Sequence, residues 1–429
     1  MTSKYFPLHK SLWAATAVEA PATVPLDNDL ETDIAIVGAG FCGLSTALHL
    51  AERGLNVTIL EAEEIGFGGS GRNGGQVIPG LKYDPSELRE KLGRDRGERL
   101  AEFSATTADT VFSLIAKHQL RVPHVRKGWV QGAHNSEALH AVQRRVKDWS
   151  ELGVDAELLD KAGVARILGS DRYLGGWVDP RGGGIQPLSY ARELGRVALA
   201  HGAKIYTRSP AIELMRVKDR WRVKTANGPS ITCTKVLIAS NGYTGDLWPD
   251  LKKTIISANS FIVATQPLPH DVKASILPQG HVSSDGRNLL LYYRIDHTGR
   301  LLMGGRGSFS EPNDPAQWLH LEGAVKKIFP QAKDCPIEFR WCGHVAVTRD
   351  FMPHIHQPAP GLLIDIGCQG RGVGLQSRMG IALAECLATD RTDALPVPPS
   401  PIEKLPFFGL RRLYLAAVIA WYKMRDGGV

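Results

Sequence analysis

The sequence predicts a mixed α/β fold, in which a Rossmann-like nucleotide-binding domain is interleaved with a domain built on an antiparallel sheet. Three observations predict this fold. A strand–glycine–helix–strand pattern occupies residues 33–61, strands of alternating polarity occupy residues 260–305, and a second strand–turn–helix pattern occupies residues 361–387. At 429 residues the chain exceeds what one hydrophobic core usually serves, so we expect two intertwined domains.

The first nucleotide-binding signal is a set of spaced glycines after a short apolar strand. Residues 33–37 read DIAIV, as a buried parallel strand should, and GAGFCG follows at once. In this fingerprint Gly38 permits the tight turn, Gly40 lets a pyrophosphate approach the backbone, and Gly43 allows close helix–strand packing. The next helix presents free N–H groups to the phosphates. The ligand-binding residues expected here are Gly38, Ala39, Gly40, Phe41, Cys42 and Gly43.

An acidic residue follows where this fold binds a ribose. Residues 56–60 read NVTIL, a second expected strand, which ends at Glu61. A carboxylate at that point can accept hydrogen bonds from ribose hydroxyls, and Ala62 is expected to lie beside it. Because strand, glycines, helix, second strand and acid are in register, the unit predicts dinucleotide binding.

A glycine-dense loop favours FAD over NAD as the dinucleotide. Residues 66–76 read GFGGSGRNGGQ, where an NAD-binding fold would proceed to its next helix and strand. A loop of this kind suits an extended ligand that lies along the backbone, although a flexible surface loop is the alternative for the motif alone.

Placed after the glycine unit, this loop resembles the D-amino acid oxidase superfamily of flavoproteins, which includes sarcosine and glycine oxidases. It is most similar to the bacterial γ-glutamylputrescine oxidases, where the loop typically reads GFGASGRNGGQ. The likeness runs nearly end to end and includes WYKMRDGGV at residues 421–429. The resemblance implies bound FAD in a glutathione-reductase-type domain and oxidation of CH–NH bonds. It also implies that Ser70, Arg72 and Asn73 contact the FAD phosphates or ribityl chain, and that Gly74, Gly75 and Gln76 pass close to the isoalloxazine.

A second glycine-rich segment, DPRGGGIQP at residues 179–187, corresponds to a family stretch that reads close to GGHIHPL. In the family this stretch lies beside FAD where the two domains meet. Here the first histidine is missing, and Gln186 stands where the second is usual. The resemblance therefore implies a changed substrate contact at Gln186, with a simple interdomain turn as the alternative.

The chain then returns to the cofactor. Residues 211–214 and 235–239 read as strands, and the second runs into a turn. By analogy with the family, Ala211 and Ile212 flank the adenine, and Ala239 and Gly242 bring the backbone near FAD.

Residues 292–294, Tyr-Tyr-Arg, are the expected substrate contacts on the antiparallel sheet. Aromatic and guanidinium groups suit a cationic amine that carries a carboxylate. Strand alternation sends Tyr292 and Arg294 to one face and Tyr293 to the other, so only one set can face the flavin. We expect that set to be Tyr292 and Arg294, with ordinary strand packing as the alternative.

A late strand–turn–helix segment differs from the usual family motif Gly-Tyr-Ser-Gly-His-Gly. Cys368, Gln369 and Arg371 stand where Tyr, Ser and His are usual. The helix N-terminus is expected to point at the pyrimidine end of the flavin, where negative charge accumulates on reduction. Arg371 would either strengthen that effect or bind a substrate carboxylate. The cofactor residues implied here are Gly370, Gly372 and Val373.

The cysteines predict neither a disulfide framework nor a metal site, because none of the six forms a CxxC pair. Cys342 lies near the place where sarcosine oxidase relatives carry a flavin-linking cysteine. The spacing is only approximate, so we expect non-covalent FAD in preference to covalent FAD.

Residues 413–422 read LYLAAVIAWY and are flanked by Arg411, Arg412, Lys423 and Arg425. Ten apolar residues are about half of what a membrane-spanning helix needs. A helix packed on the body, a helix on a membrane surface and a subunit contact remain open. The N-terminal ten residues have no apolar core of signal-peptide length, so we expect a cytoplasmic protein, with peripheral contact at the inner face of the membrane, through residues 411–425, left open. The charges, 51 basic and 44 acidic, are scattered, and no nucleic-acid partner is expected.

The expected domains follow from these assignments. The FAD-binding domain comprises residues 30–85, 150–250 and 345–395, the substrate-binding domain comprises 86–149 and 251–344, and a C-terminal helical extension comprises 396–429.

The leading functional hypothesis is an FAD-dependent oxidase or dehydrogenase in polyamine or amino acid breakdown. A small amine or amino acid would deliver a hydride from its CH–NH group to flavin N5, the imine would hydrolyse, and O2 or a respiratory quinone would reoxidise FAD. γ-Glutamylputrescine is the substrate type that the resemblance implies. One alternative is oxidation of a secondary or cyclic amino acid such as sarcosine or pipecolate. Another is a flavin protein that docks on a membrane and passes electrons to it.

Overall fold

A mostly parallel sheet carries the glycine unit. The computed structural model describes residues 4–426, so residues 427–429 of the expected C-terminal extension lie outside the described residues. Every neighbouring pair in this sheet is parallel except the last, in which β20 runs antiparallel to β21. The strand order is β10 (Lys204–Tyr206), β3 (Val57–Leu60), β2 (Ile34–Val37), β14 (Lys235–Ile238), β21 (Leu362–Ile366) and β20 (His354–Ala359).

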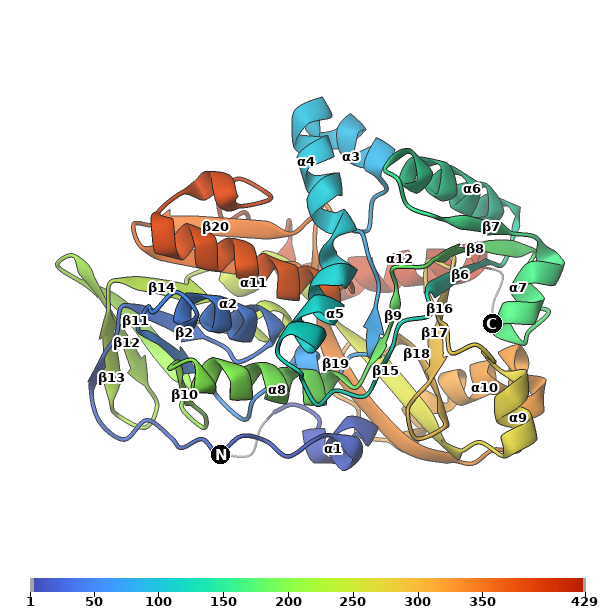
Figure 1. The fold of residues 1–429 in the computed structure, drawn as a ribbon, viewed down its shortest axis with the longest axis horizontal. Coiled ribbons are helices and arrows are strands. Elements are labelled where there is room, and N and C mark those ends of the chain that lie inside the picture. The colour runs from blue at the N-terminus through green and yellow to red at the C-terminus, as the bar shows by residue number, and fades with distance from the viewer. Residues whose placement is uncertain (1–3, 427–429) are drawn as a thin grey trace.

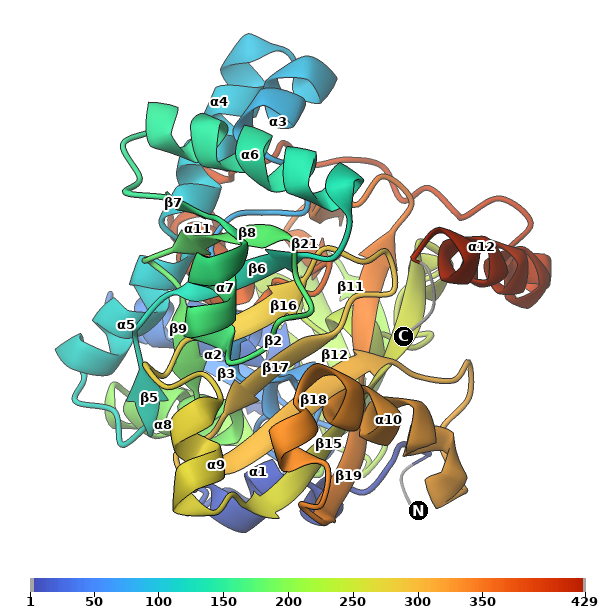
Figure 2. The same ribbon diagram turned by 90° about the vertical axis from the view of Figure 1, so that its right-hand side faces the viewer.

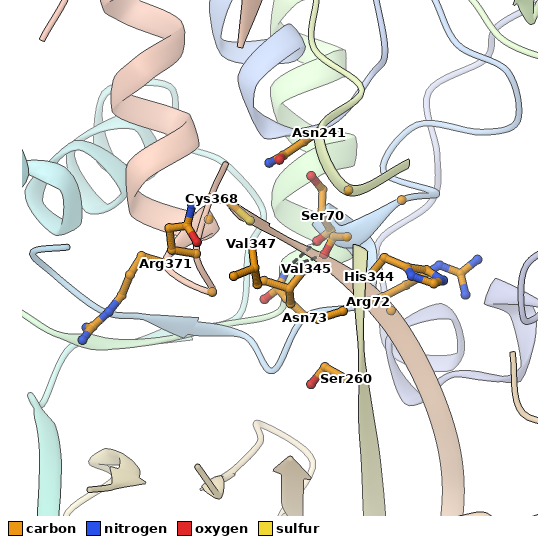
Figure 3. A pocket seen from close by; sticks show the side chains of 18 of the residues that line it. Ser70, Arg72, Asn73, Asn241, Ser260, His344, Val345, Val347, Cys368 and Arg371 are labelled. Carbon is orange, nitrogen blue, oxygen red and sulfur yellow. Dashed lines mark hydrogen bonds between the residues drawn. The ribbon is translucent and has the colours of Figure 1, made fainter. Parts of the chain in front are cut away.

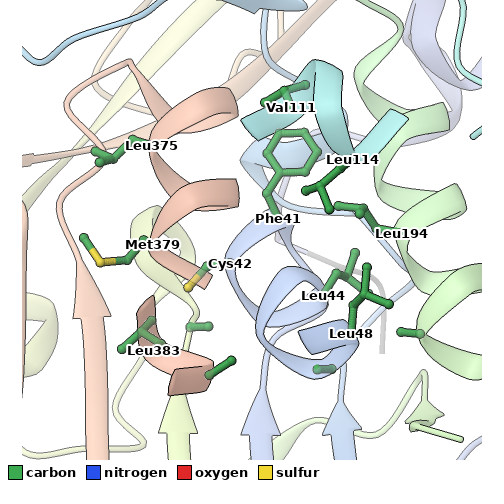
Figure 4. Packing of buried hydrophobic residues seen from close by; sticks show 14 of the residues in the cluster. Phe41, Cys42, Leu44, Leu48, Val111, Leu114, Leu194, Leu375, Met379 and Leu383 are labelled. Carbon is green, nitrogen blue, oxygen red and sulfur yellow. The ribbon is translucent and has the colours of Figure 1, made fainter. Parts of the chain in front are cut away.

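Helices cover one face of this sheet. They are α2 (Phe41–Ala51), α5 (Thr107–Lys117), α8 (Pro187–Ala200) and α11 (Gly372–Thr389). Figure 4 shows Leu44 and Leu48 of α2 between Leu194 of α8 and Leu383 of α11, within one buried cluster. Helices α2 and α11 approach at backbone distance, because a Cβ on Gly380 would lie 2.5 Å from the Cβ of Ser45.

A small sheet covers the other face. Its strand order is β1 (Leu30–Glu31), β13 (Ser230–Cys233), β12 (Arg220–Thr225) and β11 (Ala211–Val217). Trp221 and Ile231 of this sheet pack against Val236 and Ile364 of the parallel sheet. Both faces of the parallel sheet are therefore buried, which explains the continuous apolar runs of its strands.

An eight-stranded sheet forms the other half of the molecule (Figure 1). Its pairs are antiparallel except β16 with β6, which is parallel. The strand order is β19 (Ile337–Thr348), β15 (Ile255–Pro267), β18 (Arg300–Arg306), β17 (Tyr292–Ile295), β16 (Val282–Asp285), β6 (Trp129–Ala133), β8 (Gly175–Asp179) and β7 (Glu157–Leu159).

Helices pack on one face of the eight-stranded sheet. The other face is turned toward the half of the molecule that contains the parallel sheet. Residues of α7 (Lys161–Leu168) and α10 (Leu319–Ile328) join the buried cluster on the first face, near the short helix α9 (His270–Ser275). Helices α3 (Pro85–Leu92), α4 (Arg94–Ala105) and α6 (Ser136–Glu151) extend along one side of both halves (Figure 1).

A three-stranded sheet joins the two glycine-rich segments. Strand β9 (Gly183–Ile185) pairs with both β4 (Gln76–Val77) and β5 (His124–Val125), and Gln76 lies opposite Gly184. The N-terminal helix α1 (Leu12–Thr16) packs near α8, and the C-terminal helix α12 (Arg411–Arg425) projects at the side of the molecule (Figure 2).

The structure corrects the domain boundaries in two places. Residues 157–179, which we assigned to the FAD-binding domain, contribute β7 and β8 to the eight-stranded sheet. Helix α5, which we assigned to the substrate-binding domain, packs on the helical face of the parallel sheet. The reason is that short edge strands and buried helices take their partners from distant segments, which local periodicity does not show. The remaining division into domains stays a prediction.

Within residues 4–426, no helix combines the length and the apolar character that crossing a membrane requires. Helix α12 is also not packed into the body, since none of its residues is buried. The interpretation of residues 413–422 as a packed helix is therefore wrong.

The contact between α2 and α11 can be tested with a pair of glycine substitutions. Gly380→Ala should lower the free energy of unfolding by about 1–3 kcal/mol, because the added methyl group overlaps Ser45. Gly323→Ala is the matched control, because Gly323 is also within a helix but has no neighbour within 4 Å of the added Cβ. The control should be neutral or stabilising by up to about 1 kcal/mol. Equal melting temperatures for the two variants would contradict the packing described above.

Candidate active site

A cavity of about 940 Å³ lies between the parallel sheet and the eight-stranded sheet (Figure 3). One end is lined by the glycine unit and Glu61, and the middle by residues 67–70 and 72–74, by residues 343–345 and 347 of β19 and by the N-terminus of α11. Strands β15 and β17 contribute Ser260 and Tyr292. Segments that are far apart in sequence thus share one cavity.

The glycine end has the geometry of a dinucleotide site. Gly38 has a φ of +112°, which favours glycine. A Cβ on Gly43 would lie 2.0 Å from the carbonyl oxygen of Gly38, so only glycine lets α2 begin so close to the turn. The N-cap Gly40 has no side chain to cap the helix, and the Phe41 N–H donates to the Ser70 hydroxyl at 2.9 Å. The N-terminus of α2 therefore borders the cavity with its partial positive charge.

Glu61 shapes the turn that carries these glycines. Its carboxylate accepts hydrogen bonds from the backbone N–H of Ala39 at 2.7 Å and of Glu63 at 3.0 Å. Burial raises the pKa of Glu61, and these backbone hydrogen bonds act in the opposite direction. Glu61 and Ala62 both line the cavity, as the ribose-binding position of the fold requires.

The N-terminus of α11 is a second helix end at the cavity. Its N-cap is Arg371, which makes no side-chain capping hydrogen bond. Gly370, Gly372 and Val373 line the cavity beside it. Two helix N-termini, one at each side of one extended cavity, fit a ligand with a diphosphate and an electron-accepting ring system, so these residues fit FAD.

The glycine-dense loop is folded by its own polar side chains. The amide of Asn73 donates to the carbonyls of Gly69 at 3.1 Å and Ser70 at 2.8 Å, and its oxygen accepts from the N–H of Gly75 at 2.8 Å. Gln76 donates to the carbonyls of Ser283 and Tyr293. Asn73 therefore folds the loop, and Gln76 attaches it to the eight-stranded sheet. Ser70, Asn73, Gly74 and Gln76 all line the cavity.

Arg72 has a structural role that the sequence did not predict. Its guanidinium donates to the carbonyls of Phe67 at 2.6 Å, Phe6 at 2.6 Å and Cys342 at 3.4 Å. It thereby joins the loop to the N-terminal segment and to β19. This arrangement does not support the phosphate contact that we expected from Arg72, although the residue does form part of the cavity wall.

Arg294 is not a substrate contact, and this prediction is wrong. Strand alternation does place Tyr292 and Arg294 on one face, but only Tyr292 lines the cavity. The guanidinium of Arg294 lies behind the loop and donates to the carbonyls of Gly75 and of Ile185, the latter at 2.8 Å. Desolvation lowers the pKa of Arg294 to about 10. The buried cation joins the two glycine-rich segments.

Gln186 is likewise a structural residue. It is fully buried and caps α8, because its side-chain oxygen accepts the Ser189 N–H at 2.7 Å. Its amide donates to the carbonyl of Trp13 at 2.8 Å. Gln186 therefore caps the N-terminus of α8, and the predicted substrate contact at this residue is wrong.

Four other predicted residues do not line the cavity. Ala39 and Gly75 lie in loops beside the cavity, and Gly43 lies in the first turn of α2. Ile212 is 56% exposed on β11, beside a register shift, while its neighbour Ala211 does line the cavity. Ala239 and Gly242 also line it, as expected, as do Gly38, Gly40, Phe41 and Cys42.

Cys342 does not line the cavity, although its neighbours Gly343 and His344 do. Its buried thiol lies 3.6 Å from the Glu311 carboxylate, which also pairs with His344. Non-covalent FAD stays our prediction.

The end of the cavity opposite the glycine unit is rich in positive charge. Arg371 lies 4.8 Å above the Trp129 ring and donates to the carbonyl of Pro79 at 3.2 Å. Lys82 and Arg145 line the same region. Desolvation, and then the nearby charge of Arg145, lower the pKa of Arg371 to about 10.

Lys82 lies near the other two cations at this end of the cavity. Desolvation lowers the pKa of Lys82, and so do the charges of Arg371 and Arg145. Arg145 itself donates to Asp84 at 2.7 Å and to the Gln131 oxygen. The charges of Asp84 and Glu87 act on the pKa of Lys82 in the opposite direction, and Asp285 in the cavity wall is paired with Arg287. Arg145 is paired with Asp84, whereas Lys82 and Arg371 have no ion pair within residues 4–426, so these two cations suit an anionic group.

Sequence analysis missed Lys82 and Arg145, as well as Trp129 and Ser260. Arg145 lies on a charged amphipathic helix whose pattern predicts only a surface element. For Lys82, the sequence did offer a signal of a place near the cofactor, because this basic residue follows the glycine-dense loop within a few positions.

Tyr292 forms the floor between the two ends. Its hydroxyl lies 2.9 Å from the Ser260 hydroxyl, and its ring is so close to Gly74 that a Cβ there would lie 2.6 Å from a ring carbon. Burial raises the pKa of Tyr292 to about 12, so the phenol stays protonated at neutral pH and is not a general base.

Comparison with known proteins agrees with this geometry. Residues 33–386 match the family described as "DAO: FAD dependent oxidoreductase". The chain is 32% identical over 425 residues to gamma-glutamylputrescine oxidoreductase of Escherichia coli (strain K12), covering 97% of this chain and 98% of that protein. It is also 32% identical over 384 residues to "Probable oxidoreductase OrdL" of Haemophilus influenzae, covering 85% of each chain.

Solved structures show the same fold. Glycine oxidase from Geobacillus kaustophilus superposes with a TM-score of 0.71 at 20% identity, covering 85% of this chain and 96% of that one. L-amino acid deaminase from Proteus vulgaris gives a TM-score of 0.70 at 18% identity, with 91% and 100% covered. These relatives give no support to a flavin protein that passes electrons to a membrane. The family match, the relatives and the cavity lead to one conclusion: the chain belongs to the DAO family of FAD-dependent oxidoreductases.

Proposed function

We propose that this enzyme oxidises the CH–NH group of a small amine whose other end carries a carboxylate, as γ-glutamylputrescine does. The observation that carries the proposal is the group of three cations, Lys82, Arg145 and Arg371, at one end of a cavity whose other end fits FAD. A relative that covers nearly the whole chain is a gamma-glutamylputrescine oxidoreductase, which supports this substrate type.

The residues that would hold FAD are those of the glycine end and of the α11 N-terminus. Gly38, Gly40 and the start of α2 suit the diphosphate, and Gly370, Gly372 and Val373 suit the flavin. When bound, FAD supplies the acceptor for a hydride from the carbon next to the substrate nitrogen.

The protein's own side chains bind and orient the substrate. The three cations hold the carboxylate, while the Tyr292 and Trp129 rings form apolar walls that exclude water. A cationic environment also lowers the pKa of the substrate amine, so more of it is in the neutral form from which a hydride can leave. No basic side chain is needed for that step. The imine product then hydrolyses to a carbonyl compound and ammonia or an amine, and O2 or a respiratory quinone is the proposed final electron acceptor.

A second candidate is oxidation of a secondary or cyclic amino acid such as sarcosine or pipecolate. Arg371 favours it, because this cation lies at the N-cap of α11, where a carboxylate next to the reacting carbon could reach it. The two candidates differ in how far the carboxylate lies from the oxidised carbon.

An anaerobic screen separates these candidates. Purified holoprotein is mixed with γ-glutamylputrescine, putrescine, sarcosine or pipecolate, and flavin bleaching is followed by absorbance. We expect fast bleaching with γ-glutamylputrescine and little with putrescine, which has no carboxylate for the cations to bind. Equal bleaching by putrescine would contradict the role of the cationic end, and bleaching by pipecolate or sarcosine alone would support the second candidate. Repeating turnover with O2 and with a soluble quinone identifies the acceptor.

The role of Lys82 can be measured directly. Lys82→Met should raise KM for the carboxylate-bearing substrate about tenfold to a hundredfold with a smaller change in kcat, because a charge-assisted contact to the substrate is lost in both ground and transition states. Lys147→Met removes the same charge from an exposed position of α6 outside the cavity and should leave KM unchanged. A similar KM for both variants would remove Lys82 from the substrate site.

The lowered pKa of Lys82 predicts a pH effect on binding. A lysine whose pKa is lowered loses its charge at a lower pH than an ordinary lysine, so KM for the anionic substrate should begin to rise at a lower pH than the titration of an ordinary lysine would cause. Lys82→Arg keeps its charge there, and its rise in KM should move to higher pH. A pH profile that does not change in Lys82→Arg would show that another group titrates.

A further inference from the structure

Helix α12 exposes an apolar surface that the rest of residues 4–426 leaves uncovered. None of its residues is buried, and Figure 2 shows it projecting at the side of the molecule. Leu413 is 70% exposed, Trp421 48% and Met424 75%. A helix with this much apolar surface normally buries a face, so the exposed side of α12 indicates an external partner.

The exposed residues share one face of the helix. Leu413, Ala417 and Trp421 are spaced by one helical turn each, and Met424 continues the same row. Leu415, Ile419 and Tyr422, which are half-buried, lie on the opposite face of the helix. Phe407 and Leu410, just before the helix, are also exposed and extend the apolar surface.

Cations lie at both ends of α12, and the helix contains no acidic residue. Arg411 and Arg412 lie at its start, and Lys423 and Arg425 lie at its end. Arg425 pairs with Glu137 of α6. Arg412 and Lys423 have no ion pair within residues 4–426, and helical spacing places both on the same flank of the apolar face.

This charge pattern distinguishes between two possible occupants. If α12 packed antiparallel on the α12 of a second copy, Arg412 of one copy would lie next to Lys423 of the other. That arrangement places like charges together, which is unfavourable. An anionic surface, by contrast, attracts both cations.

The length and position of α12 suit the surface of a bilayer. Fifteen residues span about 22 Å as a helix, which is short of the roughly 30 Å hydrocarbon core, so the helix would lie along the surface. Tyr414 and Trp421 are residue types that favour the headgroup level.

The C-terminal end of α12 is firmly held. Asp426 accepts hydrogen bonds from the backbone N–H of Asn288 at 3.0 Å and of Leu289 at 2.8 Å, and from the Asn288 amide at 2.8 Å. Asn288 and Leu289 belong to the rim of the cavity.

We propose that α12 is a docking surface for an anionic lipid membrane. Leu413, Trp421 and Met424 enter the interface between headgroups and acyl chains, and Arg412 and Lys423 contact lipid phosphates. Because Asp426 joins the helix to residues 288–289, docking brings this rim of the cavity to the membrane surface. The inference does not depend on the substrate of the enzyme.

Vesicle sedimentation tests the proposal with the full-length holoprotein. We expect the protein to sediment with vesicles that contain phosphatidylglycerol and to stay in solution with vesicles of phosphatidylcholine alone. Added salt should weaken the binding, because the cations contribute. The double variant Leu413→Glu/Met424→Glu should bind at least tenfold more weakly. Its flavin absorbance should match the wild type, which shows that the fold is intact.

A matched control and a spectroscopic readout sharpen the test. The double variant Leu158→Glu/Leu174→Glu changes two leucines that are 47% and 46% exposed elsewhere on the surface, and it should bind like the wild type. Vesicles should shift tryptophan emission to shorter wavelength, and Trp421→Phe should abolish that shift.

Three results would overturn the proposal. The first is no sedimentation with anionic vesicles, and the second is equal binding by Leu413→Glu/Met424→Glu and the wild type. The third is a wild-type dimer in light scattering that becomes a monomer in that variant, which would show that a second copy covers the helix. None of these measurements requires amine oxidation, so failure here leaves the proposed function unaffected.

Discussion

The close approach of α2 to the Gly38 turn is the constraint on which the rest of the site depends. A Cβ on Gly43 would overlap the Gly38 carbonyl, so the sequence can start a helix here only with glycine. That contact directs the N-terminus of α2 at the cavity. Glu61 and Ser70 then hold the turn through backbone hydrogen bonds. Without this approach, α2 would not present the partial positive charge of its N-terminus to a diphosphate.

Desolvated polar side chains connect the two halves of the molecule. Arg294, from the eight-stranded sheet, binds carbonyls of both glycine-rich segments, and Arg72 joins the glycine-dense loop to β19. Gln76 binds carbonyls of the eight-stranded sheet. A glycine-rich loop has little apolar surface with which to pack, so its position depends on hydrogen bonds from buried polar groups, which are costly to leave unpaired.

The cavity separates two kinds of positive potential. At one end it comes from the backbone, through the α2 N-terminus, and at the other from side chains, through Lys82, Arg145 and Arg371. The backbone charge cannot be titrated, whereas the pKa of Lys82 is lowered by its surroundings. Cofactor binding and substrate binding are therefore expected to respond differently to pH, although both involve an anion.

Local sequence determined the elements whose chemistry is contained within a few residues. The glycine unit, its acid at Glu61 and the helix at the N-terminus of α11 were all predicted, because turn geometry and helix dipoles depend on neighbouring residues. Tertiary structure alone decided which polar side chains meet the cavity. Arg294 and Gln186 have side chains that could bind a substrate, but both form hydrogen bonds to backbone groups. Arg145 lines the cavity although it lies on a helix whose sequence pattern predicts only a surface element. The physical reason is that a side chain's partners are set by long-range packing, which no local pattern encodes.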